Sequence, residues 1–257
     1  MVDGRHTTPA DWSEADIRAV CARGTGVGAD GLVFVSPGSA PNTARMIYFN
    51  SDGSRAAMCG NAALCTTRLA ARLGIANPRG MTLETDAGTY DSRASGVGEC
   101  AELRLAPVRP PAPVAKLTTT NGERRAALGS VGVPHLVVVV DDLGRLDVVR
   151  RGKALRFDPA LGPEGANVNF ISAGGSPSEW HMRTYERGVE GETLACGTGA
   201  VAAACALAEW DLGTLPLTVW TRSGRRLIVN ARRLADGTYD KVWLTGEARL
   251  VLRGVIN

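Results

Sequence analysis

Residues 186–211 read ERGVEGETLACGTGAVAAACALAEWD and decide the fold. Alanine loses no side-chain entropy on becoming helical, so the alanine-rich residues 200–208 predict a helix. Cys196 stands at its start, followed by the Gly-Thr-Gly of residues 197–199, and the first N–H groups of a helix lack intrahelical acceptors and favour an anion. A thiol at a helix start ionises more readily than an ordinary cysteine. Two interpretations of Cys196 stay open at this point, a buried structural cysteine and a reactive one.

The same arrangement occurs a second time, in the first half of the chain. Residues 58–74, MCGNAALCTTRLAARLG, again place Cys-Gly and a polar residue before a helix, with Cys59 in the position of Cys196. Each copy follows a polar turn, which indicates an internal repeat and a pseudo-twofold arrangement of two halves. We therefore expect Cys59 and Cys196 to face each other across a cleft between two domains, which favours the reactive interpretation of both.

Length and composition indicate an ordinary globular protein and exclude several functional classes. The formal net charge of the 257 residues is +3 and the basic residues occur as scattered pairs, so neither nucleic acid nor an anionic membrane is an expected partner. No apolar run approaches the roughly 18 residues of a membrane helix, and the polar start MVDGRHTTPADWSE has no signal-peptide core. The expected location is the cytoplasm, where thiols stay reduced.

The remaining four cysteines are expected to be structural. No cysteine belongs to a C-x-x-C pair, and the three histidines do not lie at ligand spacing from the cysteines, so no metal site is expected. Cys65 and Cys205 lie inside the two predicted helices and are interpreted as packing residues. Cys21 and Cys100 are interpreted as structural too.

Apolar periodicity and turn residues predict an α+β protein whose halves each hold helices and several mostly antiparallel strands. The expected helices cover residues 13–22, 58–74, 146–156 and 196–210. The expected strands cover residues 32–35, 45–50, 81–88, 89–95, 100–106, 135–140, 167–171, 180–188, 217–224, 226–233 and 242–252. The proline-rich residues 108–113, VRPPAP, are expected to link two domains, 1–107 and 108–257, with the last few residues able to return to the first domain.

Two opposed thiols suit the inversion of a stereocentre. One thiolate removes the α-proton from one face of a carbon, and the opposite thiol delivers a proton to the other face. The N–H groups of the helix starts would stabilise the carboxylate as it becomes enolate-like. A redox disulfide is the alternative, although redox cysteines usually share one motif and these two lie in separate halves.

No cofactor is expected. Racemisation through a pyridoxal Schiff base needs a lysine, and the chain has only Lys116, Lys153 and Lys241, none in a context that suggests a cofactor pocket. The glycine-rich residues 24–31, GTGVGADG, lack the Gly-Lys-Ser/Thr ending of a phosphate-binding loop and precede a strand, which argues against a nucleotide site.

Five stretches of the chain are recognisable together. They are GVGADGL (26–32), FNSDGSRAAMCGN (49–61), GVPH (132–135), GANVNF (165–170) and RTYERGVEGETLACGTG (183–199). On these motifs, which span nearly the whole chain in order, the chain resembles the diaminopimelate epimerases, cofactor-independent two-thiol enzymes of lysine and peptidoglycan precursor synthesis. The resemblance implies two pseudo-symmetric domains, each a mostly antiparallel or mixed sheet wrapped around a central helix, with the active site in the cleft between them.

The resemblance also implies roles for individual residues. Cys59 and Cys196 would be the two acid–base thiols, the first serving the L,L isomer of 2,6-diaminopimelate and the second the meso isomer. Glu186 would contact the reacting ammonium and poise Cys196, and His135 would stand near Cys59. The implied substrate-binding residues are Gly60, Asn61, Gly197 and Thr198 for the reacting carboxylate, and Asn50, Asn167 and Arg187 for the distal amino-acid end, with Glu186 on the ammonium. The resemblance involves no cofactor and no metal, and it allows a homodimer.

Alternative interpretations remain beside these roles. From the residues alone, Asn50 also fits a turn residue, Asn167 a strand-end cap and His135 a structural hydrogen-bond donor. The start at MVDGRH falls just after a G-x-G-N-D-F-type motif of the family, so the sequence predicts a missing first strand and an unpaired sheet edge.

Two further departures concern the motifs themselves. Val133 stands where many relatives have asparagine, and Ala62 and Leu64 replace commoner residues in the first helix. The alternatives are therefore a cofactor-independent racemase of another amino acid and an inactive homologue truncated at its N-terminus.

Overall fold

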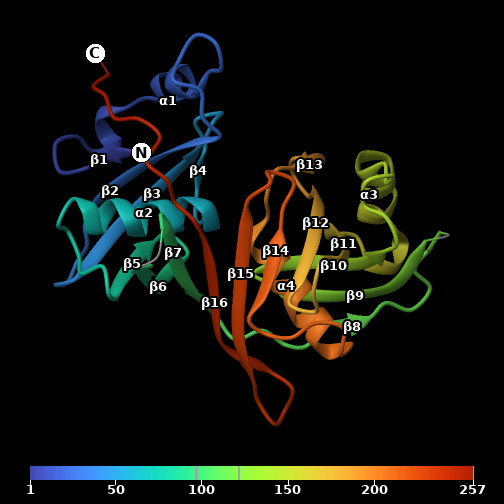
Figure 1. The fold of residues 1–257 in the computed structure, drawn as a ribbon. Coiled ribbons are helices and arrows are strands. Elements are labelled where there is room, and N and C mark those ends of the chain that lie inside the picture. Colours follow the sequence, from blue (N-terminus) through green and yellow to red (C-terminus); the bar gives the residue numbers. More distant parts are fainter. Residues whose placement is uncertain (96–97, 121, 257) are drawn as a thin grey trace. The chain divides into compact units, whose positions relative to one another are not determined.

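The chain folds into two compact units, and the computed structural model describes residues 1–95, 98–120 and 122–256 (Figure 1). The first unit combines Met1–Arg104 with the chain from Thr245 onward, and the second unit is Leu105–Leu244. The domain boundary expected after residue 107 thus lies beside the division at Leu105. The return to the first unit begins inside the final strand, β16 (Tyr239–Glu247).

The first unit is a mostly antiparallel sheet with two α-helices. Its strands lie in the order β1–β2–β3–β5–β6–β7 with β4 beside β3, and the β1–β2 and β3–β5 pairs are parallel. The elements are β1 (Val2–Asp3), η1 (Pro9–Asp11), α1 (Glu14–Cys21), β2 (Gly31–Pro37), β3 (Thr43–Asn50), β4 (Arg55–Ala56), α2 (Gly60–Arg72), β5 (Met81–Thr85), β6 (Gly88–Ala94) and β7 (Cys100–Leu105). The expectation of an unpaired sheet edge is wrong at Phe34 and Val35 of β2, which pair with Val2 and Asp3 of β1.

The two helices of the first unit use different parts of the sheet. Helix α1 begins where expected, because the Ser13 hydroxyl accepts a hydrogen bond from the Asp16 N–H as an N-cap. Its buried Ile17 packs with Phe34 of β2, and Ile47 and Phe49 of β3 join the same cluster. Side chains alternate along a strand, so Tyr48 and Asn50 of β3 point to the face opposite Ile47 and Phe49. Helix α2 packs against β2, β3, β5 and β6.

The second unit is a mixed sheet with one helix on each face. Its strands lie in the order β16–β15–β14–β12–β11–β10–β9–β8 with β13 beside β12, and the β10–β11 and β12–β14 pairs are parallel. The further elements are β8 (Ala112–Pro113), β9 (Glu123–Val131), β10 (Val133–Val140), α3 (Val148–Arg156), η2 (Pro159–Leu161), β11 (Asn167–Ala173), β12 (Glu179–Glu186), β13 (Gly191–Thr193), α4 (Gly197–Glu209), β14 (Leu217–Trp220) and β15 (Arg226–Arg233).

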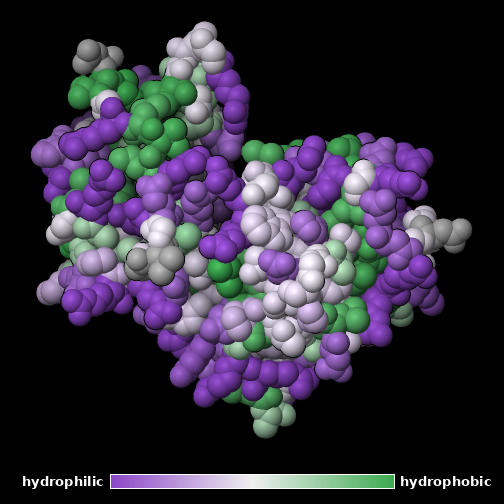
Figure 2. Space-filling view, viewed as in Figure 1, coloured by the Kyte–Doolittle hydropathy of each residue, from purple (hydrophilic) through white to green (hydrophobic). Residues whose placement is uncertain are grey.

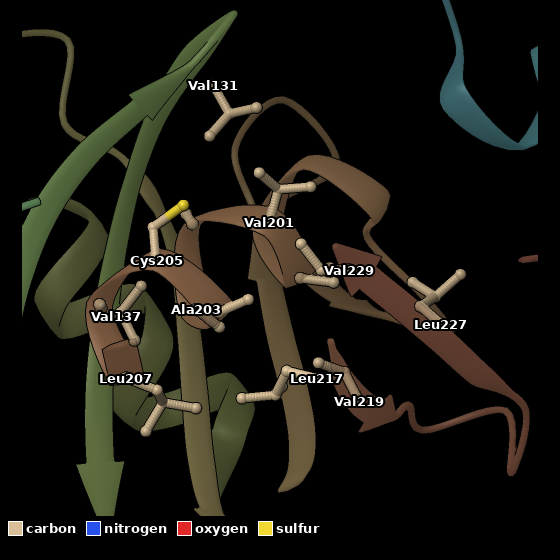
Figure 3. Packing of buried hydrophobic residues seen from close by; sticks show 14 of the residues in the cluster. Val131, Val137, Val201, Ala203, Cys205, Leu207, Leu217, Val219, Leu227 and Val229 are labelled. Atoms are coloured by element: carbon tan, nitrogen blue, oxygen red, sulfur yellow. The ribbon is translucent and has the colours of Figure 1, made fainter. Parts of the chain in front are cut away.

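Helix α4 is the centre of the second unit. It packs against β9, β10, β11 and β15, and every residue from 199 to 207 is buried. Figure 3 shows Val201 and Cys205 of α4 in a cluster with Val137 of β10 and Val229 of β15. A helix surrounded by strands needs small apolar residues on all sides, which explains why its alanine-rich sequence has no polar face. The predicted helix over 196–210 is confirmed.

The opposite face of this sheet is covered by α3. Leu136 and Val138 of β10 and Phe170 of β11 pack with α3, whereas Val137 and Ile171 belong to the cluster around α4. A strand with both of its faces covered is apolar at successive positions, as residues 136–140 of β10 are. Because side chains alternate between the two faces along each strand, one set of polar side chains lies on the face covered by α4. They are His135 of β10, Asn167 and Asn169 of β11, and Thr184 and Glu186 of β12.

Three expectations about the elements are corrected. The expected linker over residues 108–113 begins with the buried Val108, which bridges to Tyr239, and ends in the edge strand β8, where Pro113 costs no central hydrogen bond. Strand β9 was not predicted, because its residues 123–125 are charged. The final predicted strand ends early, at Glu247.

The chain after β16 presents apolar side chains to solvent. Val251, Leu252 and Val255 are exposed, and hydrophobic residues gather at the upper left of Figure 2, where Figure 1 places this end of the chain. Among the described residues, no helix has the length and apolar character needed to cross a membrane.

Candidate active site

Cys59 is the N-cap residue of α2. Its backbone is extended, with φ −144° and ψ 122°, and its carbonyl accepts the Ala63 N–H at 2.9 Å. The thiol is half-buried and makes no hydrogen bond to the first turn of the helix. A Cβ added to Gly60 would meet nothing within 4 Å, and Asn61 is exposed. The start of α2 is therefore open beside Gly60 and Asn61, and the N–H groups of its first turn have no intrahelical acceptor.

Tyr48 faces the Cys59 thiol from β3. Burial, and after it the neighbouring Cys59, raises the pKa of the Tyr48 hydroxyl above its usual range, so this hydroxyl stays protonated. The ring lies directly over Gly31, where an added Cβ would be 2.8 Å from the tyrosine oxygen and 2.5 Å from the Phe49 carbonyl. Gly31 thus provides the space that lets Tyr48 reach Cys59.

Asn50 ends the same strand and closes the turn that follows. Its Nδ2 donates to the Ser54 hydroxyl at 3.0 Å, and its backbone N–H donates to the Ser54 carbonyl at 2.9 Å. The interpretation of Asn50 as a turn residue is therefore confirmed. By strand alternation, Tyr48 and Asn50 share one face of β3.

Cys196 is the N-cap residue of α4 and repeats the backbone of Cys59, with φ −132° and ψ 110°. Its Sγ accepts the Gly199 N–H at 3.4 Å and lies 3.7 Å from the Thr198 hydroxyl. The thiol is buried, with 8% of the residue exposed. The N–H groups of Gly197 and Thr198 precede the first possible intrahelical bond and are the donors of this helix start.

His135 is fully buried beside Asn169 on the face covered by α4. Burial, and to a lesser degree the charge of Arg187, lowers the pKa of His135 to about 3, so the imidazole is neutral. Asn169 Nδ2 lies 3.2 Å from His135 Nδ1, and Asn169 Oδ1 accepts the Thr184 hydroxyl at 3.0 Å. His135 Nε2 has no hydrogen-bond partner among the described residues.

Asn167, Glu186 and Arg187 meet at the ends of β11 and β12. The Asn167 Oδ1 accepts the Arg187 backbone N–H at 2.8 Å, which fixes the turn that carries the arginine. The Arg187 guanidinium lies 3.3 Å from the exposed Glu164 carboxylate. Within the described ranges, no hydrogen bond or ion pair engages the half-buried Glu186 carboxylate. The end of β12 therefore carries an available carboxylate at Glu186, followed directly by Arg187.

Comparisons with known proteins agree with this arrangement. The sequence profile described as "Diaminopimelate epimerase" matches residues 1–104 and 128–251. The chain belongs to the diaminopimelate epimerase family. A diaminopimelate epimerase of Gemmatimonas aurantiaca is 44% identical over 99% of this chain and 93% of its own length. One from Aquifex aeolicus is 40% identical over 93% of this chain and 84% of its own length.

Solved structures show the same fold at low sequence identity. A phenazine biosynthesis protein of the PhzF family from Enterococcus faecalis has a TM-score of 0.68 at 17% identity, covering 94% of this chain and 86% of that one. A probable proline racemase from Agrobacterium radiobacter has a TM-score of 0.64 at 20% identity, covering 94% and 79%. The two-domain α+β fold of the epimerases is thus the fold of this chain, and as a member of the diaminopimelate epimerase family the chain is an isomerase.

Within each unit, the structure brings together most of the residues that the sequence singled out. In the first unit, Gly60 and Asn61 follow Cys59 at the start of α2, and Asn50 ends the neighbouring strand β3. In the second unit, Cys196, Gly197 and Thr198 form the start of α4. The other predicted site residues lie on or next to the face that α4 covers, and they are His135, Asn167, Glu186 and Arg187.

Sequence reasoning missed three residues of this epimerase. Tyr48, Asn169 and Thr184 stand beside the predicted site residues but were predicted only as strand residues. For Asn169, a polar residue between Val168 and Phe170 was the available signal, since a buried polar side chain needs hydrogen-bond partners.

Three further cysteines have thiols that burial makes less acidic. Burial, and after it Glu209, raises the pKa of the Cys205 thiol to about 12, and burial also raises the pKa of Cys65 and Cys21. These thiols stay protonated and unreactive at neutral pH. In the described part of the chain, no group of three or more His, Cys, Asp or Glu side chains is arranged to hold a metal ion.

Proposed function

We propose that this chain epimerises L,L-2,6-diaminopimelate to meso-diaminopimelate by a two-base mechanism in which Cys59 and Cys196 are the acid–base groups. The observation that carries the proposal is the matched position of the two cysteines. Each is the extended N-cap residue of a 13-residue helix that begins with glycine. A reaction that inverts one stereocentre in both directions needs two equivalent acid–base groups, and this repeat supplies them.

In the proposed reaction, the thiolate of Cys59 removes the α-proton of the L,L isomer. The electron pair of the broken C–H bond passes into the carboxylate, which becomes enolate-like. The Cys196 thiol then donates its proton to the opposite face of the carbon, giving the meso isomer and a Cys196 thiolate. The reverse reaction exchanges the two roles, so each turnover moves one proton in and one proton out.

The helix starts bind the group that gains charge. The backbone N–H groups of Gly60 and Asn61 in α2, and of Gly197 and Thr198 in α4, would hold the reacting carboxylate. Each first turn offers donors without intrahelical acceptors, and the positive end of the helix dipole favours the growing negative charge. Preorganised donors of this kind stabilise an enolate-like intermediate without reorganisation.

Side chains at the strand ends would recognise the rest of the amino acid. Glu186 would supply a carboxylate for the reacting ammonium, and the absence of a side-chain partner for it among the described residues supports this role. Arg187 would bind the distal carboxylate, because a guanidinium forms two parallel hydrogen bonds with a carboxylate. Asn50 and Asn167 would complete the distal contacts, with Asn167 also holding the Arg187 backbone.

Exchange of the α-proton in deuterated water tests the proposal. The unmodified protein is incubated with L,L-2,6-diaminopimelate and, in parallel, with a panel of other α-amino acids, and deuterium incorporation is followed by mass spectrometry. We expect incorporation into diaminopimelate. Exchange confined to another amino acid would assign a different cofactor-independent racemase, and exchange with none would assign an inactive homologue.

The reaction belongs to lysine and peptidoglycan precursor synthesis. Two attributes stay predictions, a cytoplasmic location and a homodimer. The family resemblance allows a homodimer, and analytical ultracentrifugation of the purified chain decides its oligomeric state.

A further inference from the structure

Asn169 is a buried carboxamide at the centre of the polar residues on the face covered by α4. It is 0% exposed and contacts two neighbouring strands as well as the first turn of α4. Its Nδ2 donates to the Leu136 carbonyl at 3.3 Å and lies 3.2 Å from His135 Nδ1, and its Oδ1 accepts the Thr184 hydroxyl. The reaction proposed above gives this residue no role.

The orientation of the carboxamide follows from its neighbours. A backbone carbonyl only accepts hydrogen bonds, so the atom of Asn169 beside the Leu136 carbonyl must be the nitrogen. The opposite orientation would place two acceptors against each other in a buried site. The Thr184 hydroxyl is satisfied by donating to the oxygen on the other side.

This orientation determines the tautomer of His135. The Asn169 nitrogen that donates to the Leu136 carbonyl also faces His135 Nδ1, and it has a second hydrogen to donate there. Nδ1 must therefore be the acceptor, and the single proton of the neutral ring must sit on Nε2. The lowered pKa of His135 agrees with a neutral ring.

The resulting Nε2–H group is a buried donor without an acceptor in the described part of the chain. An unpaired buried donor is costly, and native structures rarely tolerate one without a functional reason. His135 lies on the same face as Asn167 and Glu186, at the end of the sheet where the substrate groups are proposed to bind. An anionic oxygen of the substrate would satisfy the donor.

We propose that Asn169 is a positioning residue that holds His135 as the neutral Nε2–H tautomer, so that His135 donates a hydrogen bond to a carboxylate oxygen of the bound amino acid and does not act as a base. The identity of the acceptor rests on the proposed function. The tautomer rests on Asn169, Leu136 and Thr184 alone.

The same carboxamide ties His135 to the second thiol. A Cβ added to Gly199 would lie 2.2 Å from Asn169 Oδ1 and 3.1 Å from Cys196 Sγ, so glycine is required for this close approach. The Gly199 N–H is the one that donates to Cys196 Sγ. Asn169 thereby packs against the turn that holds the Cys196 thiol.

Nitrogen NMR on the unmodified protein tests the tautomer without turnover. The chain has three histidines, and with ¹⁵N-labelled histidine the His135→Gln variant assigns the His135 signals by their disappearance. We expect a neutral ring with its proton on Nε2 at pH 7, and a shift of the Nε2–H signal when meso-diaminopimelate is added. A proton on Nδ1, or an unchanged Nε2–H signal in saturating ligand, would overturn the proposal.

Two variants separate positioning from simple structural support. Asn169→Asp replaces the donor facing Nδ1 by an acceptor, so we expect the proton to move to Nδ1 and α-proton exchange to fall about 100-fold, the loss typical of a removed oxyanion donor. Thr184→Val removes one hydrogen bond to the same carboxamide but leaves its nitrogen in place, so Nε2–H should persist. An Asn169→Asp protein that keeps Nε2–H overturns the role of Asn169. If the unmodified protein shows Nε2–H but exchanges no amino acid, the proposed function and the substrate acceptor fall together, while the tautomer assignment stands.

Discussion

Cys59 and Cys196 occupy the same position in two separate helices, yet their thiols have different surroundings. Both are extended N-cap residues of 13-residue helices. The Cys196 sulfur is buried and accepts a hydrogen bond from its own helix, whereas the half-buried Cys59 sulfur makes no such bond and faces Tyr48 on a neighbouring strand. The two thiols proposed as acid–base groups therefore share a backbone position but differ in what each contacts within its own unit.

Removing either thiol tests the two-base assignment. Cys59→Ala and Cys196→Ala are each expected to reduce epimerisation by at least about 10²–10⁴-fold, because each removes a group that transfers a proton in the transition state. The measurement is conversion of L,L- to meso-diaminopimelate by chiral chromatography. Cys65→Ala, further along α2, is the control and should keep epimerising. Full activity of the Cys196→Ala protein would contradict the mechanism.

Gly31 is expected to control the position of Tyr48. In Gly31→Ala the new Cβ would lie 2.5 Å from the Phe49 carbonyl and 2.6 Å from the Tyr48 ring, so the strand or the ring must move. We expect a loss of about 1–3 kcal/mol in the free energy of unfolding, measured by urea denaturation, together with slower epimerisation. Gly80→Ala is the matched control, because a Cβ there meets nothing within 4 Å. Equal stability of the two variants would show that the ring over Gly31 is not held in place.

His135 is expected to make stability depend on pH. Burial, and after it Arg187, holds the folded-state pKa at about 3, below the ordinary value of 6.5. The unfolded chain therefore binds a proton at this residue between these pH values while the folded chain does not. The stabilisation is complete above pH 6.5 and is lost as the pH falls toward 3, by up to about 5 kcal/mol.

The matching experiment compares unfolding free energies between pH 7 and pH 4 for three proteins. His135→Gln cannot take up the proton, so its stability should fall less steeply with acidification than that of the unmodified protein. His181→Gln, at an exposed position of β12, should behave like the unmodified protein. Parallel curves for the unmodified and His135→Gln proteins would show that His135 is not held neutral by burial.

Arg187 is expected to act through its geometry as well as its charge. Arg187→Lys keeps the charge but loses the paired donors, so we expect KM for diaminopimelate to rise about tenfold or more with a smaller change in kcat. Steady-state kinetics in the direction of the meso isomer measures both. Glu164→Gln removes the partner of Arg187, and since Glu164 is 78% exposed this pair contributes little, so KM should stay within about twofold. An unchanged KM for Arg187→Lys would remove Arg187 from the distal contacts.

The sequence predicted the two helix starts because their causes are local. Cys59 and Cys196 are each followed by glycine and a run of small helix-forming residues, and these features act within a few positions of the chain. Strands β10 and β11 of the second unit were found for the same reason, since residues 136–140 are apolar throughout and residues 167–171 are rich in apolar residues. Strand β9 was missed because its first residues are charged, and its place in the sheet comes from pairing with β10.

Only the tertiary structure decided what surrounds each candidate residue. His135, Asn169 and Thr184 come from three strands, and their hydrogen bonds depend on the register of β10, β11 and β12. Tyr48 meets Cys59 because Gly31 leaves room for its ring. The sequence by itself determined where the two helix starts lie, because capping and helix propensity are short-range. The pairing of strands determined which polar side chains meet, because a buried polar atom depends on neighbours that lie far away along the chain.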